Sequence, residues 1–405
     1  MVKFIANTCV KFSRLLGNYG TSIGGKIAWT LDKNILKKLA KNVETIIVIT
    51  GTNGKTTTSN LIASCFEEPL IHNGKGANMY FGVISAFLQG EGKVAVLEVD
   101  EGSVAKVFAD LKVDYFVVTN FFRDQLDRYS EIDMLVDKIK SSISADTKLI
   151  LNANDPFTMR LDNNNSIYYG ISKDFKGFRD FEISESKYCP KCNSLLNYET
   201  SFYLQIGHYN CKCNFKTPKI DYLASSFKNS ELVVNGITYK HNLVGNYNVF
   251  NLVAAFALGN ILNLNVEAGF NKYYSNDGRM QIINEHIVTL AKNPSGMNLS
   301  LLQINPDYKN VLFTLNDNYV DGLDISWIWD ADFEILDNSY TYYVNGLRKE
   351  DMALRLKYAG INPSNINIVD NIDVELDNII KKPTFSISSY TAVDDIKKMF
   401  EKRVK

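Results

Sequence analysis

The chain of 405 residues is long enough for two or three domains. Its hydrophobic share of 45% and charged share of 22% are typical of a soluble globular protein. The formal net charge of −1 gives no global electrostatic basis for nucleic-acid binding, so we predict no nucleic-acid partner.

The first predicted segment, residues 1–43, is basic and has a helical pattern. Residues 1–41 hold seven Lys and Arg14 against the single acid Asp32, so their net charge is about +7 and that of the remainder about −8. A basic amphipathic stretch can lie on an anionic membrane surface, and a solvated helix face has the same composition. Peripheral contact with the inner membrane face is therefore one interpretation of this segment.

The sequence indicates a cytoplasmic protein. No apolar run reaches the roughly 18–20 residues that a membrane-spanning helix needs. Asn7 and Thr8 interrupt the short apolar stretch after Lys3, and no small-residue cleavage site follows, which argues against a secretory signal. In a cytosolic chain the six Cys are expected to be metal ligands or free thiols rather than disulfides.

A glycine-rich loop follows the first predicted strand, residues 44–50, and precedes a helix expected from about Thr56 to Cys65. It is shorter than G-x-x-x-x-G-K-[ST], because only two residues separate Gly51 from Gly54. Without a Cβ, glycine lets backbone N–H groups approach phosphate oxygens, Lys55 can reach the β- and γ-phosphates, and the Thr56 hydroxyl suits Mg²⁺. The predicted nucleotide-binding residues are Gly51, Thr52, Asn53, Gly54, Lys55, Thr56 and Thr57.

Further strands are predicted at 94–100, 115–120 and 148–153, with helices between them, as at 131–143. Strands that alternate with helices predict a doubly wound α/β domain. The strand 94–100 ends in Glu98 and Asp100, at the edge where open α/β sheets bind ligands. Carboxylates there can hold Mg²⁺, for which we choose Glu98, although acids at a solvated strand end would look the same.

Four of the six Cys lie in an insertion at about 186–218. Cys189 and Cys192 are separated from Cys211 and Cys213 by 18 residues, a spacing typical of a zinc ribbon. Four thiolates form a closed, structural zinc site. Since the second pair is C-x-C, His208 could replace one ligand.

The α/β pattern resumes with a helix at 247–263. From about 280 a smaller, Rossmann-like α/β domain is expected, with strands at 311–316, 341–345, 366–370 and 384–388 and helices at about 349–359 and 391–403. Residues 290–298 hold Lys292, which either approaches a phosphate or belongs to a turn.

An acidic loop, residues 315–334, follows the strand at 311–316. Five Asp beside two Trp indicate a site or an interface, although acids also favour surface turns. Asp324 is our first choice for a functional carboxylate, followed by Asp317 and Asp330.

Four motifs in order resemble the Mur ligase superfamily, which includes folylpolyglutamate synthetases. They are GTNGKTTT (51–58), TNFFRDQLDRY (119–129), LVGNYNVFNLVAAFAL (243–258) and SNDGRM (275–280). The resemblance implies an ATP site in which Asn248 and Asn251 face the adenine edge and Arg279 lies near the phosphates. Gln125 stands where the superfamily has His, which puts a second metal there in doubt. The 50 residues before Gly51 are too few for the UDP-binding domain of the amino-acid-adding Mur ligases.

The four-Cys insertion narrows the resemblance to the MurT family, the synthetase subunits of lipid II isoglutaminyl synthases. It implies a basic segment at 1–43, a Mur-ligase-type central P-loop domain with a parallel sheet at 44–279, and an α/β domain at 280–405. Implied too is peptidoglycan chemistry: ATP and Mg²⁺ activate the α-carboxylate of the D-glutamyl residue of lipid II, and ammonia from a GatD-type glutaminase subunit yields D-isoglutamine. Lys55, Glu98 and Asp324 are the expected catalytic residues, with Asp324 orienting the partner's catalytic His. An amino-acid ligase similar to folylpolyglutamate synthetases and an ATP-controlled scaffold are the alternatives.

Overall fold

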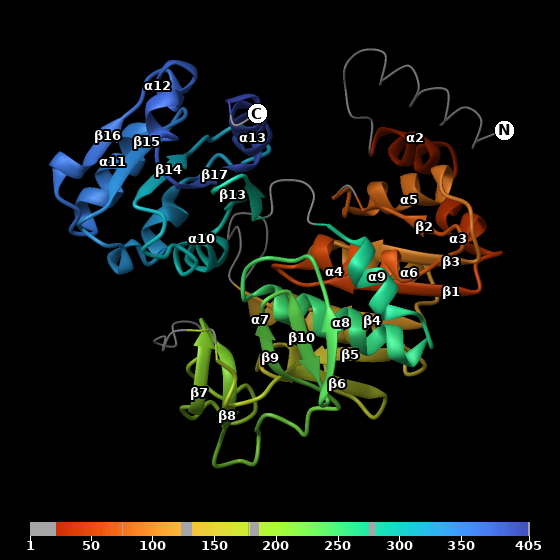
Figure 1. Cartoon of the computed structure of the whole chain (residues 1–405). Coiled ribbons are helices and arrows are strands. Elements are labelled where there is room, and N and C mark those ends of the chain that lie inside the picture. Colours follow the sequence, from red (N-terminus) through yellow and green to blue (C-terminus); the bar gives the residue numbers. More distant parts are fainter. Residues whose placement is uncertain are drawn as a thin grey trace. The chain divides into compact units, whose positions relative to one another are not determined.

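The computed structural model describes residues 22–74, 76–122, 132–176, 178, 186–274 and 280–403 (Figure 1). They fall into two compact units. The first includes the described residues up to Asn242 and those from Asn246 to Tyr273, and the second includes Leu243–Gly245 and the residues after Tyr273. Among all the described residues, no helix is both long and apolar enough to cross a lipid bilayer.

The first unit is built on one large sheet. Its strand order within the described residues is β11-β10-β9-β6-β5-β4-β1-β3-β2. Strands β1 to β6 and β9 pair in parallel with their neighbours in this order. Strands β9, β10 and β11 form an antiparallel meander. The strands are β1 (Thr45–Thr50), β2 (Ile71–His72), β3 (Val94–Glu98), β4 (Tyr115–Val118), β5 (Lys148–Asn152), β6 (Ser166–Ile171), β9 (Tyr222–Lys228), β10 (Glu231–Val234) and β11 (Ile237–Lys240).

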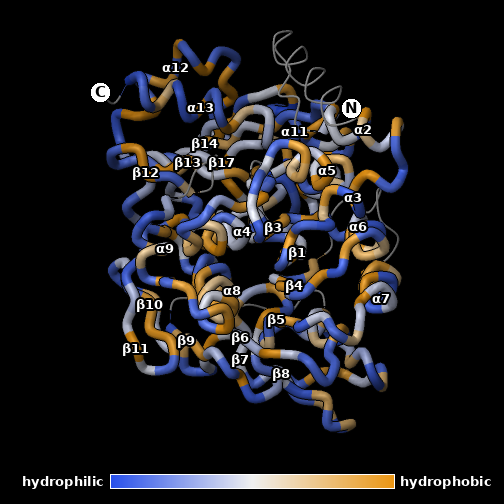
Figure 2. The backbone as a smooth tube through the Cα atoms, turned by 90° about the vertical axis from the view of Figure 1, so that its right-hand side faces the viewer, coloured by the Kyte–Doolittle hydropathy of each residue, from blue (hydrophilic) through white to orange (hydrophobic). Residues whose placement is uncertain are grey.

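Helices cover both faces of this sheet, because its central strands are apolar on both sides. Figure 2 shows the apolar character of β1, β4 and α8 in orange and tan. On one face, α2, α3, α5, α6 and α7 share a core with alternate residues of the central strands. On the other, α8 packs on β5, β6 and β9, and α4 packs on β1 and β3. The helices of this unit are α2 (Ile23–Leu31), α3 (Ile35–Ala40), α4 (Lys55–Ser64), α5 (Tyr80–Gln89), α6 (Val104–Asp110), α7 (Ile132–Ser142), α8 (Asn248–Ile261) and α9 (Val266–Lys272), with 3-10 turns η1 (Glu101–Ser103) and η2 (Thr158–Arg160).

A separate hairpin, β7 (Asn197–Tyr203) with β8 (Ile206–Asn210), emerges between β6 and β9. Its Tyr209, with the buried Cys189 and Cys211, belongs to the same apolar core as α5 and α7. The insertion is therefore packed onto the first unit.

The second unit has a six-stranded sheet in the order β12-β13-β17-β14-β15-β16, parallel except for β12. Helices α12 and α13 share a core with β13 and β14, and α11 contacts β15 and β16. Its strands are β12 (Gln281–Ile283), β13 (His286–Leu290), β14 (Asn310–Thr314), β15 (Thr341–Asn345), β16 (Ile366–Ile368) and β17 (Thr384–Ser388). Its helices are α10 (Pro294–Leu301), α11 (Lys349–Tyr358), α12 (Ile372–Ile379) and α13 (Tyr390–Arg403), with 3-10 turns η3 (Ser326–Asp330), η4 (Phe333–Ile335) and η5 (Pro363–Asn365).

The predicted α/β class is confirmed: a parallel sheet with a four-Cys insertion and a second, smaller α/β unit. The antiparallel meander β9–β11 was not predicted, and it makes the large sheet mixed. The domain limits at residues 43 and 279 stay predictions. The segment 290–298 includes the start of α10, which Asn293 caps by accepting a hydrogen bond from Gly296 N at 2.7 Å.

Candidate nucleotide and metal sites

The glycine-rich loop joins β1 to α4, as the sequence predicts. Gly51 and Gly54 have φ angles of 128° and 85°, in the left-handed region that favours glycine. A Cβ on Gly51 would meet the Thr119 hydroxyl, and one on Gly54 would meet the side-chain oxygen of Asn251. Both glycines are therefore required by backbone conformation and by close packing.

The segment after β4 holds the glycine-rich loop in place. Thr52 N donates to Asn120 O at 2.8 Å, and Asn53 N donates to Asn120 Oδ1 at 2.9 Å. Thr119 Oγ1 donates to Asn53 O at 2.7 Å, and Phe122 N donates to Thr52 Oγ1 at 2.9 Å. Residues 119–122 thus form a hydrogen-bonded support for Thr52 and Asn53.

The ammonium group of Lys55 is buried at the base of this loop. Its Nζ donates to Gly51 O, to Thr52 O at 3.2 Å and to Glu101 Oε2 at 3.0 Å. Burial by itself lowers the pKa of Lys55, but the attraction of Glu101, with Asp100 and Glu98, outweighs it, and the pKa is raised. Lys55 is therefore a charged group, held by a carboxylate where the loop would receive a phosphate.

Glu98 lies at the end of β3, where the register pairs it with Ile49 of β1. The side chain is 2% exposed, and its two oxygens accept from Thr56 Oγ1 at 2.7 Å and Asn78 Nδ2 at 2.9 Å. The contact with the Thr56 hydroxyl brings together the two oxygen donors predicted for Mg²⁺, and such donors fit that cation. Asp100 is not a strand residue as expected: it caps the 3-10 turn η1 through a hydrogen bond from Gly102 N.

Helix α8 brings the two Asn of its first turn to the same loop. Asn248 and Asn251 are buried, and Asn251 Nδ2 donates to Asn248 Oδ1 at 2.8 Å. Asn251 Oδ1 accepts from Thr58 Oγ1 of α4 at 3.2 Å. The structure therefore brings both Asn beside the predicted nucleotide loop.

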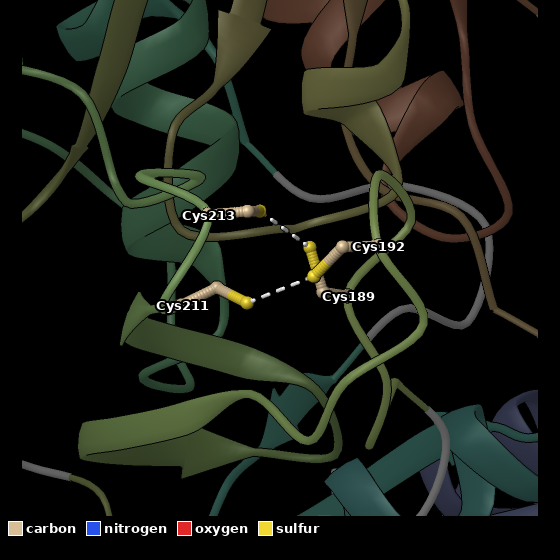
Figure 3. Close-up of side chains that lie close together, drawn as sticks. All are labelled: Cys189, Cys192, Cys211 and Cys213. Atoms are coloured by element: carbon tan, nitrogen blue, oxygen red, sulfur yellow. Dashed lines mark hydrogen bonds between the residues drawn. The ribbon is translucent and has the colours of Figure 1, made fainter.

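The four cysteines of the insertion form one cluster (Figure 3). Their Sγ atoms lie within 4.8 Å of one another, with 3.5 Å between Cys189 and Cys213 and 3.4 Å between Cys192 and Cys211. Lys191 N donates to Cys189 Sγ at 3.4 Å, so a backbone amide already points at a thiol. Four sulfurs at this separation fit a tetrahedral metal ion such as Zn²⁺. His208 is not in the cluster, because its Nε2 bonds to Ile171 O at 2.8 Å.

The acidic loop of the second unit contains carboxylates in two different environments. Three of them bind neighbouring groups: Asp317 pairs with Arg348 at 2.7 Å, Asp321 accepts from Thr391 N at 2.8 Å, and Asp332 exchanges hydrogen bonds with Asn298. Asp324 and Asp330 are exposed. These contacts hold the acidic loop in place. They account for Asp317, Asp321 and Asp332 as structural residues of the loop.

Asp324 is an exposed carboxylate with one oxygen fixed by a backbone hydrogen bond. Its Oδ1 accepts from Ser326 N at 2.8 Å at the start of η3. This backbone hydrogen bond, with one from the Ser326 side chain, lowers the pKa of Asp324. The group is therefore an exposed, ionised carboxylate at neutral pH.

Comparison with known proteins agrees with this arrangement. The Mur ligase middle domain family matches residues 49–259, and the MurT ligase C-terminal family matches residues 290–393. The MurT subunit of lipid II isoglutaminyl synthase (glutamine-hydrolyzing) from Staphylococcus aureus (strain COL) is 42% identical over 381 residues, which span 88% of this chain and 87% of that protein. This chain belongs to the MurT family.

Two other similarities extend the comparison. The MurT subunit from Streptococcus pneumoniae (strain ATCC BAA-255 / R6) is 33% identical over 95% of this chain and 93% of that protein. A pseudomurein peptide ligase type C from Methanothermus fervidus shares the fold, with a TM-score of 0.72 and 24% identity over 91% of this chain and 81% of that one.

Some predicted features of this MurT chain lie outside the described residues: Arg279, Gln125 and residues 1–21. Sequence reasoning also missed three residues. Glu101 directly follows the strand that ends in Glu98 and Asp100, and nothing in its spacing indicated the ion pair with Lys55. Asn78 Nδ2 donates to the Glu98 carboxylate, and the Asn73 side chain bonds to the backbone N and O of Glu98. The only available signal for these two residues was their place in the segment HNGKGANM (72–79), which resembles the MurT family.

Proposed function

We propose that this chain is the ATP-dependent amidating subunit of a lipid II isoglutaminyl synthase. It would convert the α-carboxylate of the D-glutamyl residue in the lipid II stem peptide into the amide of D-isoglutamine. The observation that carries the proposal is the joint presence of the compact phosphate loop, with Lys55 and the Thr56–Glu98 pair at its base, and a MurT C-terminal domain. A Mur ligase middle domain implies the use of ATP.

The reaction proceeds in two displacements. A carboxylate oxygen of the substrate attacks the γ-phosphorus of ATP, and ADP leaves. Ammonia then attacks the carbonyl carbon of the acyl phosphate, phosphate leaves with the bonding electrons, and the nitrogen loses a proton. Lys55, the loop N–H groups and the N-terminus of α4 stabilise the charge of the transferring phosphoryl group. For this, Lys55 must exchange at least one of its three acceptors, Gly51 O, Thr52 O and Glu101 Oε2, for a phosphate oxygen.

Two metal ions are part of the proposal. Thr56 and Glu98 would hold Mg²⁺, which neutralises phosphate charge when bound. Cys189, Cys192, Cys211 and Cys213 would hold Zn²⁺ in a closed site. With no open position for a substrate, that second ion would have a structural role.

The ammonia would come from a separate GatD-type glutaminase subunit. Glutamine hydrolysis of this class needs an activated thiolate. Four of the chain's cysteines form the metal-type cluster, and burial raises the pKa of Cys65 to about 12, which disfavours its thiolate. Tyr319, Val320 and Leu323, 80%, 62% and 67% exposed, flank Asp324 and offer an apolar docking surface. Asp324 would orient the partner's catalytic His from there.

The decisive experiment is amidation of lipid II by the reconstituted complex, followed by mass spectrometry. ATP with glutamine, or ATP with ammonium alone, should add one amide at the second stem residue. Free glutamate should not be incorporated, and its incorporation would instead favour an amino-acid ligase. ATP turnover with no modified product would favour a scaffold.

Substitution Lys55→Ala should abolish amidation from both nitrogen sources, because the phosphoryl group loses its principal cation. Lys93→Ala is the matched control, since Lys93 is a solvent-exposed partner of Glu44 and should leave activity unchanged. Normal amidation by the Lys55→Ala complex would refute the nucleotide assignment.

Substitution Asp324→Asn should reduce glutamine-driven amidation by a factor of about 100 or more while ammonium-driven amidation and ATP binding survive. The reason is that the carboxylate acts on the glutaminase rather than on ATP. Asp307→Asn, an exposed acid elsewhere in the second unit, is the control. Equal loss with ammonium and glutamine would remove Asp324 from the glutaminase mechanism.

A further inference from the structure

The two ends of the β7–β8 hairpin have different surroundings. The cysteine pairs lie beyond its open end, before β7 and after β8, and the turn lies at the other. Hairpin turns are normally exposed. Here the turn residues Tyr203, Leu204, Gln205 and Ile206 are at most 3% exposed, and Leu204 adopts a φ of 49°. Support of a metal cluster at the open end does not explain why the turn is buried and why its backbone is strained. These features indicate that the turn makes a contact of its own.

Gln205 at this turn binds the segment that follows β4. Its Nε2 donates to Phe121 O at 2.6 Å and lies 3.4 Å from Asp155 Oδ1. The other oxygen of Asp155 accepts from Phe121 N at 2.8 Å. Gln205 and the fully buried Asp155 therefore hold both backbone polar groups of Phe121.

The residues on either side of Phe121 bind the phosphate loop. Asn120 accepts from Thr52 N and Asn53 N, and Phe122 N donates to Thr52 Oγ1. The hydrogen bonds alternate along the segment, as in an extended strand: residues 120 and 122 face the loop, and residue 121 faces the hairpin turn. The segment is thus fixed between the turn and the phosphate loop.

The aromatic ring of Tyr203 makes a second connection. Its centroid lies 6.0 Å from that of Phe122 and 5.9 Å from that of Phe250, in an edge-to-face contact with the latter. Phe250 stands on α8 between Asn248 and Asn251. The hairpin turn therefore contacts both the loop support and the helix that carries the two Asn.

We propose that Gln205 is a positioning residue for the nucleotide. The turn of the β7–β8 hairpin fixes the position of residues 119–122, and these residues fix the conformation of the phosphate loop. This inference rests on the proposed ATP-dependent function. It gives the insertion a task in the reaction, in addition to its own folding.

The test compares Gln205→Met with His208→Ala. Met has a similar length and removes the Gln205 Oε1 acceptor, which has no partner among the described residues, but it also leaves Phe121 O without its donor. The Tm should therefore fall by only a few degrees, as for the loss of one buried hydrogen bond. His208→Ala breaks the hydrogen bond from the same hairpin to Ile171, away from the loop support. For Gln205→Met we expect about a tenfold rise in the KM for ATP and the Kd for ADP, with the KM for lipid II and kcat within twofold of wild type. His208→Ala should leave the KM for ATP unchanged.

Amide hydrogen exchange provides the readout that general destabilisation would not give. In Gln205→Met, exchange should accelerate at residues 50–58 and remain at the wild-type rate in β10 and β11. If Gln205→Met does not fold, the same comparison is made on wild-type protein with and without Zn²⁺, with the metal content measured. The inference would be overturned if amide exchange at residues 50–58 were unchanged in Gln205→Met, or in zinc-free protein where that is used instead. An equal rise in the KM for ATP in Gln205→Met and His208→Ala would also overturn it.

Failure of the proposed function would look different. Wild-type protein and Lys55→Ala would then bind ADP equally weakly, and no comparison at Gln205 would be informative about ATP. Normal ADP binding by wild type with no effect of Gln205→Met would overturn the positioning role alone.

Discussion

Lys55 and Glu101 form a 3.0 Å ion pair in which both side chains are more than nine-tenths buried. An incoming nucleotide competes with Glu101 and two loop carbonyl groups for Lys55, and its phosphates must approach the Glu101 carboxylate. Substitution Glu101→Gln removes that competition and repulsion. We expect the Mg²⁺-free affinity for ADP to rise about tenfold, equivalent to ~1.4 kcal/mol.

Fluorescent ADP titrated in the presence of EDTA measures this effect without any contribution of Glu101 to Mg²⁺ binding. Glu91→Gln, an exposed acid of the same unit, should leave the affinity unchanged. An unaltered or weaker affinity of Glu101→Gln would show that the ion pair does not oppose nucleotide binding.

At the residue scale, the sequence reveals residue types but not their partners. Gly51, Gly54, Lys55 and Thr56 were found because their spacing is itself the chemical signal. The five Asp of the acidic loop looked alike in sequence, yet Asp321 and Asp332 turned out to bind Thr391 and Asn298, which lie far along the chain. Gln205 had no signal, because its role depends on a contact across 84 positions.

At the scale of elements, one arginine of α11 fastens the acidic loop. Arg355 is 3% exposed and donates to Ile328 O at 3.0 Å and Ala331 O at 2.7 Å, while its guanidinium lies over Trp329 and Phe333. Arg355→Met would leave two carbonyl groups unpaired, so we expect a loss of ~2–4 kcal/mol in the free energy of unfolding of the second unit.

Urea unfolding measures that loss, and glutamine-driven amidation should fall more than ATP binding because the loop carries Asp324. Arg403→Met is a suitable control, since its partners Asp373 and Asp377 are largely exposed and the expected loss is below ~1 kcal/mol. Similar losses for both variants would contradict a special role of Arg355.

Elements also differ in how well their pattern predicted them. Strands β1, β14, β15 and β17 are rich in β-branched and aromatic residues, and the sequence predicted their limits to within one or two residues. The meander β9–β11 is half exposed and contains many small and polar residues, so its pattern is weak. Its Asn235–Gly236 turn is nevertheless a hairpin signal that the sequence does contain.

At the scale of the whole molecule, charge is nearly balanced but unevenly distributed, about +7 in residues 1–41 and −8 beyond. Within the described part of that segment, Lys33 and Lys41 are exposed, and Lys33 Nζ lies 3.1 Å from the centroid of Trp29. We expect the protein to sediment at low ionic strength with vesicles that contain anionic lipid. It should dissociate at about 0.5 M salt, because the Debye length is then short and the attraction between charges is screened.

The double substitution Lys33→Glu with Lys41→Glu should weaken vesicle binding. The double substitution Lys381→Glu with Lys382→Glu changes the net charge equally at exposed positions of the second unit and should not. Equal weakening by both, or equal binding to neutral vesicles, would argue for a solvated helix face instead.

The four-Cys insertion lies between two neighbouring strands, which has a consequence for how a chain of this kind can evolve. Strands β6 and β9 are direct parallel neighbours, and a parallel pair needs a crossover of only about a dozen residues. The chain instead uses all of residues 172–221 between them. An ancestral connection could therefore lengthen in steps without disturbing the order of the sheet, and each added stretch would be free to acquire a metal or a new contact with the catalytic edge.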